Sequence, residues 1–182
     1  MSEYPGAYYH GLIATPDCSA CPLRDDVKVY PDGPVPARIA IVGEGPGSSE
    51  TAMGRGFIGP SGKLLWHLAQ EAGFTRDEVW VTNAALCAPR KVKLASGAVL
   101  PQVYVQALSS MYCRSRLLHE LVAVNPKVVI PVGNWALWAL TDIPKAKIYA
   151  YRGSRVDIDL QTMADIVDSG RARVPLKQIK QG

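Results

Sequence analysis

Three short apolar runs mark the part of the chain that folds as a sheet. They cover residues 38–42, 78–83 and 127–132, are rich in Val and Ile, and are bounded by turn-forming residues. Continuous apolar runs of this length are typical of strands that are buried on both faces of a parallel sheet. We therefore predict three neighbouring parallel strands.

A stretch with apolar residues at helical spacing follows each of these runs. The stretches cover residues 61–72, 102–124 and 134–140. In the first of them, Ser61 is the expected N-cap and Gly73 the expected stop. Alternating strands and helices predict an α/β protein whose parallel sheet has right-handed crossovers. Residues 172–177 are a candidate fourth strand.

The carboxyl ends of the three strands are the expected place for a ligand, as in other open parallel sheets. Residues 43–47, Asn83 and Gly133 follow these ends. The stretch 39–68 also holds seven glycines, which let the backbone approach a ligand closely but cost entropy when ordered. A dinucleotide site is disfavoured, because Ser48 replaces the third glycine of that motif and Glu44 would repel a pyrophosphate.

Length predicts one domain over residues 1–182, and composition indicates that it is globular. The chain has 48% hydrophobic and 20% charged residues and a net charge of +4, which permits a polyanionic partner without requiring one. No apolar run approaches the roughly 20 residues of a membrane span, and the first residues do not resemble a signal peptide. We expect a cytoplasmic protein without a membrane partner. The basic tail, residues 171–182, is either a solvated end, a strand or a contact with a partner.

Four cysteines point to a metal centre. Cys18 and Cys21 form a C-x-x-C pair, whereas Cys87 and Cys113 are single and remote. In a reducing compartment, metal binding or redox chemistry is favoured over disulfides. Four thiolates suit either tetrahedral zinc or a [4Fe–4S] cluster. Because a second close pair is missing, the spacing favours the cluster, with zinc and unliganded thiols as the alternatives.

Several motifs occur together in an order that resembles one enzyme family. The C-x-x-C pair is followed by GEGPGSSE, GRGFIGPSGKLL, VTNAALC, Cys113 and NPKVVIPVGNWAL. Over about residues 15–140 the chain resembles the iron–sulfur uracil-DNA glycosylases of the family 4 type. The resemblance implies a three-layer sandwich around a parallel sheet of about four strands and a pocket for a uracil turned out of DNA. It also implies a [4Fe–4S] cluster that ties the N-terminal arm to the domain through Cys18, Cys21, Cys87 and Cys113.

The resemblance also implies roles for the glycine-rich stretch. Glu44 would orient water or stabilise the sugar cation during hydrolysis of the N-glycosidic bond. Glu50 is the second acidic candidate, and its alternative is an ordinary loop carboxylate. Phe57 would stack on the base and Asn83 would read the Watson–Crick edge; core packing and a turn are their alternatives. The backbone of Gly45, Pro46 and Gly47 would face the uracil carbonyl oxygens.

Two segments are candidates for binding the DNA backbone. The glycine-rich stretch ends at a helix start, where Ser61, Gly62 and Lys63 would approach a phosphate. The basic segment after Cys87 would hold phosphates through Arg90, Lys91 and Lys93. Solvated lysines and a solvated loop are the alternatives.

One feature of the family has no counterpart here. Family members carry a His-Pro-Ser type loop near the C-terminus, whose histidine stabilises the leaving uracil anion, whereas no histidine follows His119 in this sequence. Losing such a group typically costs about 10²–10³ in rate. Two functions therefore compete: a weakly active uracil-DNA glycosylase, and a catalytically degenerate DNA-binding or scaffold subunit with a replication or repair protein as partner. Glu44, Phe57 and Asn83 favour the enzyme.

Overall fold

The three apolar runs form one parallel sheet. Strands β1 (Ile39–Gly43), β2 (Val79–Asn83) and β5 (Val128–Pro131) are paired in the order β2-β1-β5. The predicted strands are confirmed, with ends that differ by at most one residue. Gly43 pairs with Asn83, so the first two strands end at the same level.

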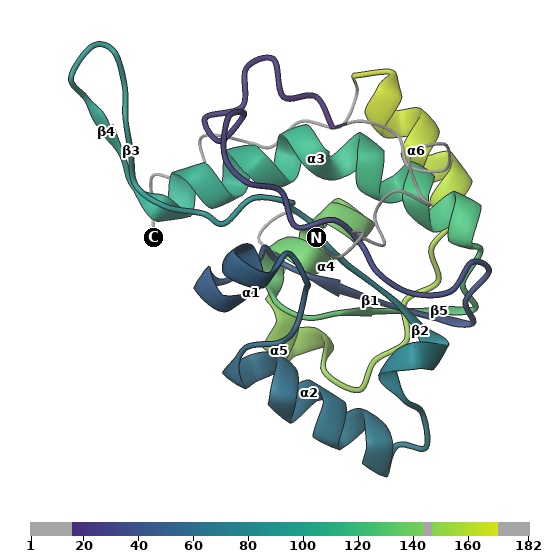
Figure 1. Ribbon diagram of the computed structural model, residues 1–182. Helices are drawn as coiled ribbons and strands as arrows, with labels where there is room; N and C mark the ends of the chain where they lie inside the picture. The colour runs from purple at the N-terminus through teal and green to yellow at the C-terminus, as the bar shows by residue number, and fades with distance from the viewer. Residues whose placement is uncertain (1–15, 144–146, 171–182) are drawn as a thin grey trace.

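The computed structural model describes residues 16–143 and 147–170 (Figure 1). Within them the parallel sheet has three strands. The candidate fourth strand, residues 172–177, and the basic tail lie outside the described residues. No helix in the described part of the chain is both long and apolar enough to cross a membrane.

Helices cover both faces of the sheet, which gives the predicted α/β architecture (Figure 1). Alternate residues of a strand point to opposite faces. Ala40 and Val42 of β1 pack in a core with α3 (Gln102–Val124) and α4 (Asn134–Thr141). Ile41 of β1 packs in a second core on the opposite face, against α2 (Pro60–Glu71). The sheet therefore lies between two helical layers.

The ends of α2 correct one sequence-based prediction. The N-cap is Gly59 rather than Ser61, and Pro60 occupies the first turn. Proline suits that place because its fixed φ matches the helix and its missing N–H is not needed there. Gly73 follows the C-cap with φ of +87°, so the predicted stop is confirmed.

Several short elements were not predicted. They are α1 (Ser48–Met53), the 3-10 helix η2 (Arg76–Glu78), β3 (Val92–Lys93), β4 (Val99–Leu100), α5 (Ile148–Tyr151) and α6 (Leu160–Asp168). Strands β3 and β4 form an antiparallel hairpin that projects from the domain (Figure 1). Helix α6 packs along α3, where Asp168 accepts a hydrogen bond from Ser115 at 2.6 Å.

The N-terminal arm, residues 16–37, runs along the outer edge of β2. Asp32 and Val81 exchange two backbone hydrogen bonds, and Val29 N–H donates to the carbonyl oxygen of Leu86 at 2.8 Å. A further antiparallel bridge joins Lys28 to Cys87. The arm therefore covers the backbone groups of an edge strand and lies beside the first residues after β2.

Candidate active site

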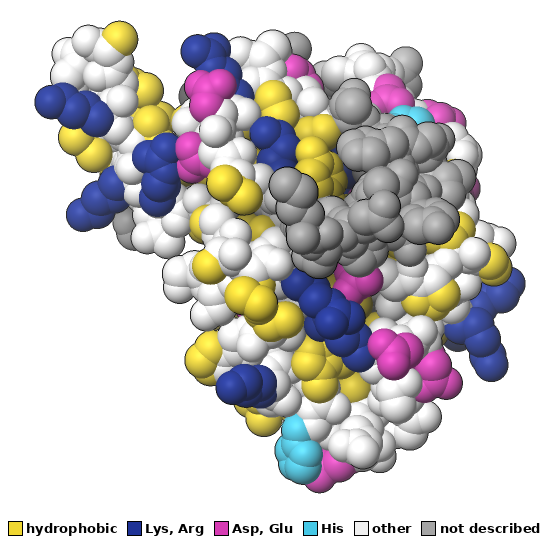
Figure 2. Space-filling model, in the orientation of Figure 1, with side chains coloured by type: hydrophobic (Ala, Val, Ile, Leu, Met, Phe, Trp, Pro, Cys, Tyr) yellow, Lys and Arg dark blue, Asp and Glu magenta, His cyan; other side chains and the backbone are white. Residues whose placement is uncertain are grey.

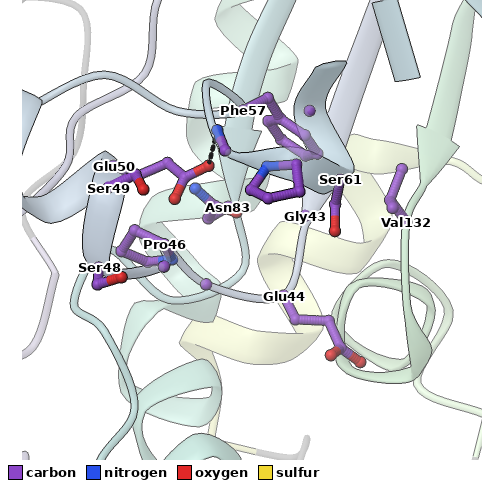
Figure 3. A pocket seen from close by; sticks show the side chains of 15 residues that line it. Gly43, Glu44, Pro46, Ser48, Ser49, Glu50, Phe57, Ser61, Asn83 and Val132 are labelled. Atoms are coloured by element: carbon purple, nitrogen blue, oxygen red, sulfur yellow. Dashed lines mark hydrogen bonds between the residues drawn. The ribbon is translucent and has the colours of Figure 1, made fainter. Parts of the chain in front are cut away.

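A cavity of about 360 Å³ opens at the carboxyl ends of β1 and β2 (Figure 3). A volume of this size accommodates a small planar ligand. The wall combines the glycine-rich stretch with the ends of β2 and β5. Nine of the predicted site residues line it: Glu44, Gly45, Pro46, Gly47, Glu50, Phe57, Ser61, Gly62 and Asn83.

Asn83 presents a polar side chain to this cavity from the last position of β2. The residue is only 5% exposed. Its Oδ1 atom lies where a β-carbon on Gly43 would come within 2.3 Å. Among the described residues, Arg116 hydrogen-bonds the backbone carbonyl oxygen of Asn83, and the side-chain amide lines the cavity. The amide is therefore available to a ligand.

Phe57 forms the wall beside Asn83. Its φ of +55° is unusual for a bulky residue, and its carbonyl oxygen accepts a hydrogen bond from Trp66 Nε1 at 2.8 Å. A β-carbon on Gly62 would come within 2.1 Å of the same carbonyl oxygen. The two rings also make an edge-to-face contact at 6.3 Å. Phe57 thus packs in the core and lines the cavity, in a backbone conformation that its neighbours enforce.

Glu50 ties the two halves of the glycine-rich stretch together. Its Oε1 atom accepts hydrogen bonds from Gly59 N–H at 2.9 Å and Ile58 N–H at 3.2 Å (Figure 3). These contacts hold the segment that enters α2 against α1. They are the contacts expected of a structural loop carboxylate, and the catalytic role of Glu50 stays a prediction.

The side chain of Glu44, in the loop after β1, lies at the N-terminus of α4. Its Oε1 atom accepts the Trp135 backbone N–H at 2.9 Å, and a β-carbon on Gly133 would lie 2.4 Å from the Glu44 side chain. A carboxylate at a helix N-terminus is stabilised by the helix dipole. Figure 3 shows the carboxylate pointing away from the Asn83 amide and the Phe57 ring. Its other oxygen makes no hydrogen bond with the described residues.

A buried ion pair lies behind Asn83 and was not predicted from the sequence. Arg116 and Glu120 of α3 are 2.6 Å apart, with side chains 0% and 1% exposed. Arg116 also donates to the Asn83 carbonyl oxygen at 2.7 Å and to Thr82 Oγ1 at 3.0 Å. Glu120 accepts the indole N–H of Trp80 at 2.6 Å. The pair therefore fixes the end of β2 that carries the cavity amide.

A second charged cluster supports the loop that carries Phe57. Asp32 of the arm pairs with Arg55 at 2.8 Å and with Arg76 at 3.1 Å. Burial raises the pKa of Asp32, but the two arginines outweigh this effect and hold the pKa below its usual value. The Arg76 guanidinium stacks 4.8 Å from the Trp66 ring. The arm is thus connected to the cavity wall through Arg55 and Trp66.

The four cysteines come from the arm, the segment after β2, and α3. Cys21 and Cys87 are buried in one apolar cluster with Leu23 and Val105, and Cys113 is also buried. Burial is the main cause that raises the pKa of the Cys87 thiol to about 12. Lys28 lowers this pKa, whereas Cys113 and Cys21 raise it further. Burial likewise raises the pKa of Cys21, with smaller contributions from Cys113 and Cys18. Within residues 16–143 and 147–170, however, no three His, Cys, Asp or Glu side chains are arranged to hold a metal ion.

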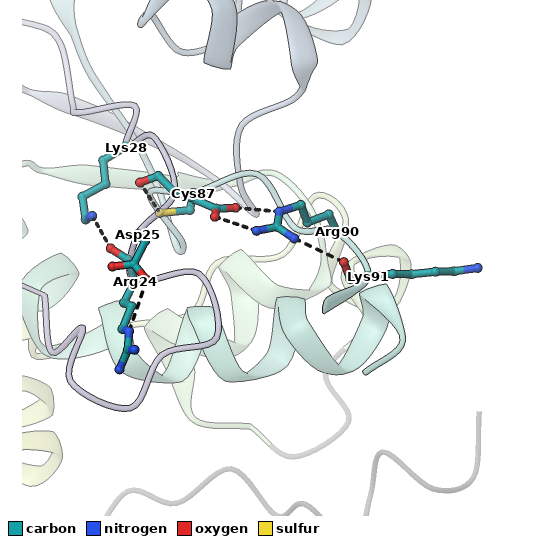
Figure 4. A network of polar contacts seen from close by, with 7 residues as sticks. Arg24, Asp25, Lys28, Cys87, Arg90 and Lys91 are labelled. Atoms are coloured by element: carbon teal, nitrogen blue, oxygen red, sulfur yellow. Dashed lines mark hydrogen bonds and ion pairs between the residues drawn. The ribbon is translucent and has the colours of Figure 1, made fainter. Parts of the chain in front are cut away.

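The remaining predicted residues lie outside the cavity wall. Lys63 is exposed on the first turn of α2. Arg90 makes a two-pronged ion pair with Asp26, at 2.7 and 2.8 Å (Figure 4). Lys91 and Lys93 lie at the start of the β3–β4 hairpin. The structure therefore separates the three basic residues after Cys87 from the base-sized cavity.

The fold and the cavity define an α/β protein with a small-ligand site at the carboxyl ends of parallel strands. The family model of the uracil DNA glycosylase superfamily matches residues 30–174. The chain is similar to the Type-4 uracil-DNA glycosylase of Thermotoga maritima, with 36% identity over 77% of this chain and 69% of the relative. The Type-4 uracil-DNA glycosylase of Pyrobaculum aerophilum is 29% identical, over 83% of this chain and 77% of the relative. The chain belongs to the uracil-DNA glycosylase superfamily.

Proposed function

We propose that this protein is a uracil-DNA glycosylase, which hydrolyses the N-glycosidic bond of a uracil turned out of DNA. The observation that carries the proposal is the position of Asn83, a buried residue at the end of β2 whose side chain lines a base-sized cavity. The similarity of the chain to Type-4 uracil-DNA glycosylases supports the same conclusion.

The pocket chemistry matches uracil. The Watson–Crick edge of uracil offers one N–H donor beside a carbonyl acceptor, and an Asn amide offers the complementary acceptor and donor. Phe57, held in place by Trp66, supplies a flat surface for the base. Glycines at positions 43, 45 and 47 leave room for the backbone to approach the carbonyl oxygens.

The reaction needs an activated water and a stabilised leaving group. Water forms a bond to the sugar C1′ carbon while the bond from C1′ to uracil N1 breaks, and its electron pair leaves with uracil. Glu44 is our candidate for accepting the water proton and for stabilising the positive charge on the sugar. The helix α4 N-terminus fixes one of its oxygens and leaves the other available.

We infer a slow reaction. None of the described residues lining the cavity is a histidine. The developing uracil anion would then rely on backbone N–H groups of the 45–47 loop and on Asn83. Since one well-placed donor contributes about 10²–10³ in rate, excision should be correspondingly slower than in a glycosylase that has one.

We also propose that Cys18, Cys21, Cys87 and Cys113 hold a [4Fe–4S] cluster. The chemistry of the donor set fits, since all four ligands are thiols and three are buried. The thiols lie close enough for their charges to affect one another's pKa, which supports a shared site. The cluster would be structural, holding the arm against the domain, because thiols would fill every protein coordination position.

The DNA backbone is the proposed partner of the rim. Ser61 and Gly62 lie in the first turn of α2 at the cavity edge, and Lys63 is exposed on the same turn. A helix N-terminus with a nearby lysine attracts a phosphate. We place the phosphate beside the extruded nucleotide at this point.

A cleavage assay tests the proposed function. The protein is incubated in excess with single-stranded oligonucleotides that contain one uracil, thymine or cytosine, and abasic sites are revealed by alkali. We expect cleavage at uracil alone. Glu44→Gln should reduce the rate with little change in DNA affinity, because glutamine retains the oxygen that accepts the Trp135 N–H. DNA binding without any cleavage would instead support the degenerate scaffold.

A further inference from the structure

The β3–β4 hairpin exposes large apolar side chains to solvent. Val99 is 57% exposed, Val103 at the start of α3 is 54% exposed, and Leu94 in the turn is 39% exposed. Figure 2 shows hydrophobic and basic side chains together on this projecting lobe. Apolar groups gathered on a projecting element indicate a contact surface.

The hairpin has one inward and one outward face. Val92 pairs with Leu100, and both pack against the apolar cluster that contains Cys21 and Cys87. The next pair, Lys93 and Val99, points outward. The turn is closed by a hydrogen bond from Leu94 N–H to the carbonyl oxygen of Ala98 at 2.8 Å. The outward residues therefore stand on a supported base.

Both stems of the hairpin are anchored at the loop that forms the cavity. Pro89, before β3, lies 3.4 Å from the point where a Gly45 β-carbon would be. Gln106, after β4, donates to the Glu44 carbonyl oxygen at 3.0 Å. A ligand held in the cavity is consequently close to the root of the hairpin.

The charge of the hairpin fits a polyanion. Residues 90–101 contain three basic residues and no acidic one. Arg90 is occupied by Asp26, whereas Lys91 and Lys93 make no salt bridge with the described residues. These two lysines, both on the β3 side of the hairpin, are free to contact phosphates.

We propose that the β3–β4 hairpin is a duplex-opening element: Lys91 and Lys93 grip the backbone while Leu94 and Val99 enter the base stack. Apolar side chains inserted between base steps unstack DNA, and they would fill the space that an extruded nucleotide leaves. This inference rests on the proposed function. It assigns to the hairpin the step that separates a base from its duplex neighbours.

The test compares duplex and single-stranded substrates. Leu94→Ser with Val99→Ser should slow uracil excision from a duplex by roughly tenfold or more, given the burial that two such side chains lose. Excision from a single strand should stay within about twofold, because no stack has to be opened. The matched control, Leu68→Ser with Val128→Ser, changes residues that are 51% and 52% exposed elsewhere and should leave both rates unchanged.

A fluorescence readout separates this inference from the proposed function. In a duplex with 2-aminopurine beside the uracil, unstacking raises fluorescence whether or not the bond is cleaved. The wild type should raise the signal and the hairpin variant should not. The proposal is overturned if the hairpin variant loses excision equally on duplex and single-stranded DNA. It is also overturned if the variant excises uracil from the duplex and raises the fluorescence as the wild type does, and the hairpin would then contact a protein instead. Absence of all excision with a retained fluorescence rise would defeat only the proposed enzyme.

Discussion

Replacing Glu120 by Leu should destabilise the protein strongly, because the substitution leaves a buried guanidinium without its counter-charge. Glu120 is 2.6 Å from Arg116 and 2.6 Å from the Trp80 indole nitrogen, and both charged side chains are essentially unexposed. Removing one partner of a buried ion pair costs about 3–5 kcal/mol. For a chain of 182 residues this corresponds to a fall in melting temperature of roughly 6–20 °C.

The double variant Arg116→Met with Glu120→Leu provides the decisive comparison. It removes both charges and replaces them with side chains that fill similar space, and such replacements are often neutral or stabilising. In the double variant, Asn83 and Thr82 would lose the donor that Arg116 supplies to them. We therefore expect the double variant to melt above the Glu120→Leu single variant but to excise uracil less efficiently than the wild type.

Thermal unfolding followed by circular dichroism, at equal protein concentration and under anaerobic conditions, measures these differences. A Glu120→Leu variant that melts within about 2 °C of the wild type would mean that the charge is not buried as described, given the cost expected for an unpaired charge. A double variant that melts below the single one would contradict the reasoning in a different way. It would show that Arg116 stabilises the fold independently of Glu120.

Three further perturbations test other parts of the structure. Gly43→Ala places a methyl group within 2.3 Å of Asn83 Oδ1 and should abolish most uracil excision, measured by oligonucleotide cleavage, while circular dichroism shows a folded protein. The lowered pKa of Asp32 means that its arginine contacts stabilise the fold above about pH 4 and are lost as the pH falls further, so Asp32→Asn should flatten the acid branch of a melting-temperature profile. Cys87→Ser should lower both the iron content, measured by a colorimetric assay, and the melting temperature; wild-type protein with zinc and no iron would refute the cluster.

The hydrophobic pattern was sufficient to predict the sheet and its main helices. Buried parallel strands have few polar positions, so β1, β2 and β5 stand out in the sequence. The range predicted for α3 has the same ends as the helix in the structure, where Pro101 precedes it and Asn125 ends it in a left-handed conformation. The range predicted for α2 begins one residue late, since Pro60 and not Ser61 is the first residue of this helix.

The cavity was also accessible from sequence, because strand ends in a parallel sheet meet at one edge. The spacing of glycines around residues 43–62 indicated a close backbone approach, which the contacts at Gly43 and Gly62 explain. The buried ion pair of Arg116 and Glu120 could not be predicted from the sequence. Arg116 and Glu120 are one helical turn apart, a spacing that solvent-facing pairs share, and their burial depends on how β2 packs against α3.

The hairpin was missed for a different reason. Its strands have two residues each, which is too short for an alternating pattern to be recognised. A turn signal was present, since Ser96 and Gly97 separate two short β-type runs and Gly97 has φ of +84°. The basic residues of the segment predict a DNA-binding loop, which gives its charge but not its hairpin structure.

The most direct test of the central claim is single-turnover excision of uracil from a single-stranded oligonucleotide, with wild type beside Asn83→Asp. The aspartate has the shape of asparagine but cannot donate to the uracil carbonyl, and its charge repels the departing anion. We predict slow but complete release of uracil by the wild type and a loss of about 10²-fold or more in the variant, as for removal of one donor to a developing oxyanion. Equal rates for the two proteins, or no release by the wild type while DNA remains bound, would contradict the account.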